Sequence, residues 1–133
     1  MNSCAELFHL VSPTVDFPQV FLTEDLGEVD RVRQAIERVF PDVHWFGERG
    51  YVIEPASGTT AEIVFWRDGV GAVNSGLVDR IAVAVHDDGD PRTIVSPLCR
   101  MHGWSACDSS LTLIDSGSGI RRIWSTEHVR NAV

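Results

Sequence analysis

The most regular alternation of apolar and polar side chains runs from Val78 to His86 (VDRIAVAVH). A period of two places Ile81, Val83 and Val85 on one side of a β-strand and the smaller or polar residues on the other. We therefore expect the aliphatic side of this strand to face a hydrophobic core. The opposite side is expected to be covered by a helix or partly exposed.

A helical period marks a second kind of element between Val29 and Phe40, where apolar residues recur at spacings of three and four. This spacing predicts a helix with one apolar stripe facing the core and a charged outer face. Asp25 and Glu28 precede the stripe with the spacing of a capping box. Pro41 is expected to end the helix.

Another apolar stripe runs from Ile94 to Met101, after the helix-start signal formed by Asp90 and Pro91. Gly103 is expected to cap the C-terminal end of this helix. Pro97 lies inside the stripe, where proline removes a backbone hydrogen bond. The pattern favours one helix kinked at the proline, and a shorter helix that starts beside the proline remains the alternative.

Shorter apolar runs predict the remaining strands. Residues 1–18 are expected to form a loose lead-in, residues 42–50 a connector, and residues 120–133 a tail. The order β-α-β-β-β-α-β predicts an α+β fold with one mainly antiparallel sheet of four to six strands and two helices on one face. The short strand candidates are Gln19–Thr23, Tyr51–Glu54, Ala61–Trp66, Trp104–Cys107 and Leu111–Ile114.

Composition places the chain among small soluble domains. Its 133 residues fit one domain over residues 1–133, and its net charge is −8 with arginine as the only long basic side chain. This acidic balance argues against nucleic acid and anionic membranes as partners. Glu6 and His9 interrupt the short apolar run near the start, so it does not resemble a signal peptide. We therefore expect a cytoplasmic protein.

The acidic turn formed by Asp87, Asp88 and Asp90 is the candidate contact surface for another protein. Opposite charges steer association, so a basic partner would suit this turn. The simpler interpretation is that these acids cap the following helix, where the helix dipole favours negative charge.

Cys99, His102 and Cys107 form the one cluster with zinc-type ligands, although its spacing lacks the paired cysteines of zinc motifs. Free cysteines in a helix stripe and a strand are usually small buried hydrophobes. We expect core packing here, and neither a metal nor another cofactor.

A catalytic alternative uses His86 and Asp108, which follow predicted strands, together with Cys107. No nucleophile elbow accompanies these residues, so we expect no enzymatic activity from them. The glycine-rich segment at residues 69–76 does not have the spacing of a dinucleotide-binding loop.

Four tryptophans are a high proportion for a chain of this length. Trp104 follows the cap of the second helix and is expected in the core, whereas Trp45 and Trp66 flank predicted loops. A buried tryptophan serves the core, and an exposed one indicates a binding hot spot. Both interpretations remain open for the loop-flanking pair.

The segment at residues 79–110, which contains DRIAVAVHD and GDPRTIVSPLCRMHGWSACDSS, resembles small standalone bacterial immunity-type proteins of polymorphic toxin and secretion systems. The resemblance implies a non-catalytic domain that binds and neutralises or supports a partner protein. Two other functions remain open. One is a small enzyme or ligand-binding domain with a pocket near His86 and Asp108, and the other is a structural homodimer.

Overall fold

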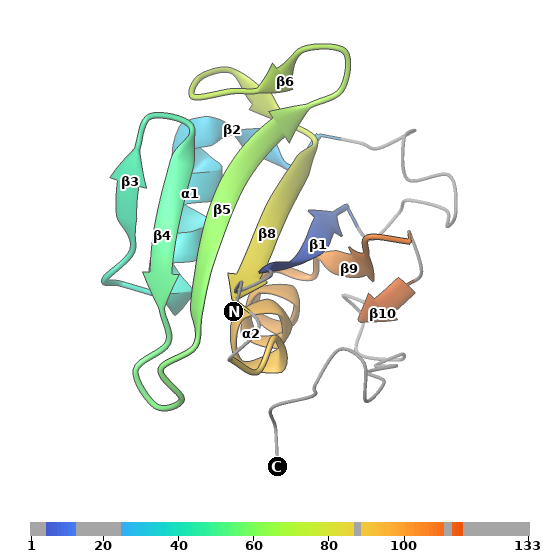
Figure 1. Cartoon of the computed structure of the whole chain (residues 1–133). Helices are drawn as coiled ribbons and strands as arrows, with labels where there is room; N and C mark the ends of the chain where they lie inside the picture. Colours follow the sequence, from blue (N-terminus) through green and yellow to red (C-terminus); the bar gives the residue numbers. More distant parts are fainter. Residues whose placement is uncertain (1–4, 13–24, 87–88, 111–112, 116–133) are drawn as a thin grey trace.

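The computed structural model describes residues 5–12, 25–86, 89–110 and 113–115. These residues form an α+β fold in which antiparallel strands build one large sheet and two helices lie behind it (Figure 1). Seven strands of the large sheet lie side by side in the order β10-β9-β1-β8-β5-β4-β3. The eighth strand, β6, pairs with the C-terminal end of β5. A separate two-stranded ribbon pairs β2 with β7.

The described residues contain two helices and ten strands. The helices are α1 (Val29–Val39) and α2 (Arg92–His102). The strands of the large sheet are β1 (Ala5–Val11), β3 (His44–Phe46), β4 (Arg49–Ile53), β5 (Thr60–Arg67), β6 (Gly71–Ala72), β8 (Arg80–His86), β9 (Ser105–Asp108) and β10 (Leu113–Asp115), and those of the ribbon are β2 (Gly27–Glu28) and β7 (Leu77–Val78).

The hydrophobic core lies between the helices and one face of the large sheet, here called the helix-covered face. Alternation along β8 buries Ile81, Val83 and Val85 on this face, as the period of two predicted. The opposite side of β8 was expected to be covered by a helix or partly exposed, and it is partly exposed. Each strand beside β8 contributes its own buried set. These side chains and those of the helices form one cluster, whose larger members include Phe8, Leu10, Ile36, Ile63, Phe65, Ile94 and Leu98.

The predicted lead-in is wrong for residues 5–11, which form β1 in the middle of the sheet. This strand pairs with β8 on one side and with β9 on the other. Phe8 and Leu10 are fully buried, so the interruption by His9 reflects the alternation of a strand rather than a loop. The predicted strand Gln19–Thr23 and the tail at residues 120–133 lie outside the described residues.

The predicted strand number and order also need correction. The large sheet has eight strands rather than four to six, because β1, β3 and the short strand β6 were assigned to a lead-in, a connector and a loop. The hairpin of β4 and β5 is confirmed, with Tyr51 opposite Glu62. Short strands such as His44–Phe46 carry too few residues for a period of two to appear.

Helix α1 has the predicted bounds and stripe, with Val32 and Ile36 buried. Its capping box does not form, because Glu28 is the N-cap residue and makes no side-chain cap bond. The outer side of the helix is tied to the sheet edge through Trp45, whose indole Nε1 donates to Glu37 Oε2 at 2.9 Å. The connector at residues 42–50 is therefore a packed hairpin rather than a loose link.

Helix α2 is one continuous helix with Pro97 inside it. Gly103 caps its C-terminal end with φ of 72°, a left-handed conformation that glycine adopts without a Cβ penalty. Ser96 Oγ donates to Asp115 Oδ2 at 3.0 Å within the core. These contacts hold the helix across β9 and β10 despite the proline.

Candidate functional site

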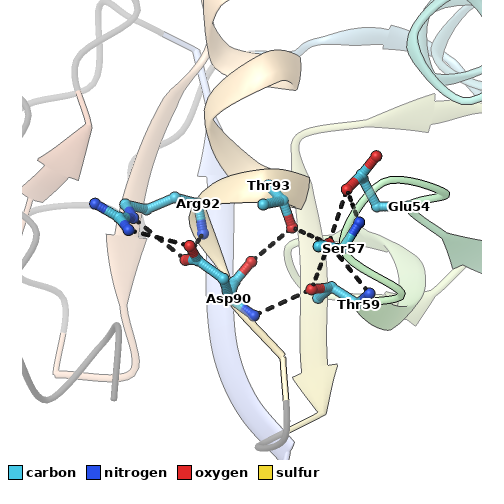
Figure 2. Close-up of polar contacts among 6 residues, drawn as sticks. All are labelled: Glu54, Ser57, Thr59, Asp90, Arg92 and Thr93. Atoms are coloured by element: carbon cyan, nitrogen blue, oxygen red, sulfur yellow. Dashed lines mark hydrogen bonds and ion pairs between the residues drawn. The ribbon is translucent and has the colours of Figure 1, made fainter. Parts of the chain in front are cut away.

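The predicted acidic turn is only partly within the described structure, since Asp87 and Asp88 lie outside the described residues. Asp90 precedes α2, and its carboxylate accepts from the Arg92 backbone N–H at 3.1 Å. The Arg92 guanidinium contacts both oxygens of the same carboxylate, at 3.2 and 3.1 Å (Figure 2). The Asp90 charge is thus already matched by a cation in the folded chain.

The same turn docks onto the hairpin between β4 and β5 through a chain of hydroxyl groups (Figure 2). Thr59 is buried, and its Oγ1 accepts from the Asp90 N–H at 3.1 Å and lies 2.8 Å from Ser57 Oγ. Ser57 Oγ also lies 2.7 Å from Glu54 Oε1. Hydrogen bonds from the Ala56 backbone N–H and from Ser57 lower the Glu54 pKa. These contacts connect the turn before α2 to the β4–β5 hairpin.

The structure places His86 and Asp108 on opposite faces of the sheet. Asp108 is the cross-strand neighbour of Phe8, whose ring belongs to the core, and paired residues share a face. His86 pairs with Ala5 and contacts the Tyr51 ring edge-on, on the face without helices. The geometry therefore does not bring the two residues of the predicted pocket together.

The zinc-type cluster is also not assembled. Cys99 lies on the core side of α2, whereas Cys107 lies on β9 opposite His9. Both thiols are buried and reduced. Within the described residues, no three His, Cys, Asp or Glu side chains are grouped so as to hold a metal ion. Burial raises the pKa of Cys107 to about 12, which disfavours the thiolate that a nucleophile or metal ligand requires.

His9 is a partly buried titratable residue on β1, in the segment that was predicted to be a lead-in. Burial, and then the nearby positive charge of Arg80, lower its pKa to about 4. Its Nδ1 atom is buried and has no hydrogen-bond partner in the described structure. The ring is therefore neutral at physiological pH, and the thiol of Cys107 beside it is protonated. This pair is not an activated cysteine–histidine dyad.

The face of the sheet without helices, here called the helix-free face, carries large polar and aromatic side chains. The Arg80 guanidinium lies 5.6 Å from the centre of the Trp66 ring, across the β5–β8 pairing. Arg49 and Glu62 form an ion pair at 3.2 Å on the neighbouring strands. All four side chains are partly or largely exposed. Tyr51 lies on the same face, where its ring contacts the ring of His86.

The described tryptophans serve different roles. Trp104 is buried beside α2, as predicted. Trp45 packs on Phe65 with ring centres 5.4 Å apart, on the helix-covered face. Trp66 lies on the helix-free face, and Trp124 lies outside the described residues. In the sequence AEIVFW, inward-pointing Ile63 and Phe65 alternate with outward-pointing residues. This alternation could have predicted that Trp66 lies on the face opposite the core.

A hollow of about 540 Å³ lies beside the glycine-rich segment at residues 69–76, which contains β6 and leads into β7. Glu48 and Arg67 line it with opposite charges. The Arg67 guanidinium is directed at the Leu77 carbonyl, 3.5 Å away. The hollow has no predominant charge among these side chains and indicates no particular ligand.

Comparisons with protein-family models, with curated proteins and with solved structures found no match. In the part of the chain that the structure describes, neither helix is both long and apolar enough to cross a membrane.

Proposed function

We propose that this chain is a non-catalytic protein-binding domain, of the immunity or accessory kind that its central segment resembles. The observation that carries the proposal is the helix-free face, where Trp66, Arg80 and Tyr51 stand partly exposed on a rigid sheet. Tryptophan, tyrosine and arginine are the residue types enriched among binding hot spots.

Contacts within this face hold its large side chains in place before any partner arrives. The Arg80 guanidinium packs over the Trp66 ring, and the rings of Tyr51 and His86 contact each other in an edge-to-face arrangement. Each side chain that is ordered beforehand reduces the entropy lost on association. Such a surface needs no catalytic group, in keeping with the neutral His9 and the protonated Cys107.

The acidic turn is a second contact in this proposal, through the charges of Asp87, Asp88 and Asp90. The Asp90 carboxylate is paired with Arg92, so its contribution to steering is reduced. Replacing Asp87 and Asp88 with asparagine should therefore slow association and lower its salt dependence more than Asp90→Asn does. Stopped-flow association rates at two ionic strengths would measure the difference.

The test of the helix-free face is affinity capture from the native lysate, followed by titration of the captured partner against purified variants. We expect Trp66→Ala to weaken binding by about 2 kcal/mol or more, roughly thirtyfold in Kd. Met101→Ala is the matched control, since Met101 is an exposed apolar residue of α2, 61% accessible. Equal affinity of the Trp66→Ala variant and the wild type would place the contact elsewhere.

Two readouts distinguish the alternatives. Light scattering that gives twice the chain mass, lost in Trp66→Ala, would assign the helix-free face to a homodimer. A ligand-dependent rise in Tm that disappears in His86→Ala would favour a ligand-binding domain instead. Thermal unfolding of each unliganded variant confirms that the fold is retained.

A further inference from the structure

A second hollow, of about 330 Å³, lies on the helix side of the sheet, where α1 meets the C-terminal end of α2. Arg31, Gln34, Ala35 and Arg38 line it from α1, and His102 lines it from α2. Spacings of three, four and seven place the α1 residues on one side of the helix. Ala35, the smallest of them, leaves the space between the two arginines open.

The His102 ring lines this hollow and is held by two contacts within the protein. Its Nε2 atom lies 2.6 Å from the Ala35 carbonyl oxygen. A carbonyl oxygen can only accept, so Nε2 carries the proton and Nδ1 is the nitrogen left for another partner. The ring also packs against Trp104, with centres 4.8 Å apart. Both contacts hold the imidazole in place without a ligand.

The charge of the hollow is opposite to that of the chain. The net charge is −8, yet the described lining residues include two arginines and no acid. Neither arginine belongs to an ion pair among the described residues, although Glu28 lies one turn before Arg31. The two guanidinium groups are therefore available to an anion.

The helix dipole explains only one of these arginines. Arg38 lies in the last turn of α1, where a cation is favoured. Arg31 lies in the first turn of the same helix, where the dipole disfavours positive charge. The pair is thus not a consequence of helix stabilisation.

We propose that this hollow binds the phosphate group of a small anionic ligand. Arginine guanidinium groups donate paired hydrogen bonds that match phosphate oxygens. Two arginines and the Gln34 amide supply more donors and charge than one carboxylate would use. The site is independent of the helix-free face and does not rest on the protein-binding proposal.

The test is an NMR titration of the isotope-labelled full chain with inorganic phosphate, at constant ionic strength. We expect saturable shifts around Arg31, Arg38 and His102, with a Kd near or below about 1 mM, and at least about tenfold weaker binding of acetate. Glycerol phosphate serves as the ester probe. Tighter binding than inorganic phosphate assigns the site to a phosphate ester, and weaker binding assigns it to the free ion.

The double variant Arg31→Gln/Arg38→Gln should bind phosphate at least about tenfold more weakly. Both residues are exposed, so the fold should be retained, which circular dichroism checks. Arg100→Gln is the control: it removes the same type of charge from α2, about 200° around the helix from His102. Non-saturating shifts, an unaffected double variant, or an equal loss in the control would each overturn the site.

Discussion

The two faces of the large sheet are built from the same strands but differ in what their side chains contact. On β5, Ile63 and Phe65 point toward the helices and are fully buried, whereas Val64 and Trp66 point the other way and remain partly exposed. Aliphatic and aromatic residues from both helices and from most strands of the large sheet fill the helix-covered face. The helix-free face holds its large residues in pairs, such as Trp66 with Arg80.

Under the proposed function, this difference separates the side chains that stabilise the fold from those that contact a partner. Side chains of the helix-covered face interlock at the density of a protein interior, so each contributes to folding. A tryptophan and a tyrosine on the helix-free face fill no such space, yet they expose apolar surface to water. A domain gains little stability from exposed aromatic side chains. For this reason we propose that the helix-free face binds a partner.

The largest expected effect is the loss of stability on the helix-covered face. Ile63→Ala should lower the free energy of unfolding by about 2–5 kcal/mol, because it opens a cavity among fully buried neighbours. Val64→Ala, one residue along the same strand, is the matched control and should cost about 1 kcal/mol or less. Urea unfolding measures both, and similar losses would contradict the division into two faces.

A tight contact at the edge of the helix-covered face gives the second prediction. A Cβ atom on Gly50 would lie 2.4 Å from Cζ3 of Trp45, so Gly50→Ala forces the indole away from Phe65. We expect a loss of about 1–3 kcal/mol, as for other overpacked sites. In a Trp45→Leu background the same substitution should cost much less. Equal costs in both backgrounds would show that the indole is not the obstacle.

The third prediction concerns His9, which lies on the helix-free face and is partly buried. Its pKa is lowered to about 4 from the ordinary 6.5, so the unfolded chain binds a proton at a higher pH than the folded chain does. Unfolding then becomes easier as the pH falls from about 6.5 to about 4, and the contribution is flat outside this window. His9→Gln should reduce the pH dependence of the urea midpoint within the window. An unchanged dependence would exclude His9 as its source.

Hydrophobic periodicity was sufficient to predict the helices and strands that bury one well-defined apolar face. It predicted α1, the β4–β5 hairpin and the inward side of β8, since each carries several aliphatic residues in register. It missed β1, which was assigned to a lead-in, because Glu6 and His9 leave only a short apolar run there and a partly buried histidine is indistinguishable from a solvated one in the sequence.

The candidate sites were less predictable, because they depend on pairings between distant segments. His86 and Asp108 are the last residues of β8 and β9, but their partners on β1, Ala5 and Phe8, lie three positions apart and therefore on opposite faces. The hollow beside α1 joins Arg31 to His102 across 71 positions of the sequence, and no spacing pattern records that contact. The acidic turn was visible in the sequence, yet its ion pair with Arg92 was not recognised there.

The smallest expected effect belongs to the ion pair between Arg49 and Glu62 on the helix-free face. Their side chains are 56% and 42% exposed, so water screens the attraction and ordering two long side chains offsets it. A double-mutant cycle with Arg49→Gln and Glu62→Gln should therefore give a coupling energy of about 0.5 kcal/mol or less for folding. The same cycle measured on partner affinity should give a larger value if the pair lies in the interface, because a partner removes the water around it. A large coupling for folding with none for binding would mean that this pair stabilises the domain, and it would contradict the proposal that the helix-free face binds a partner.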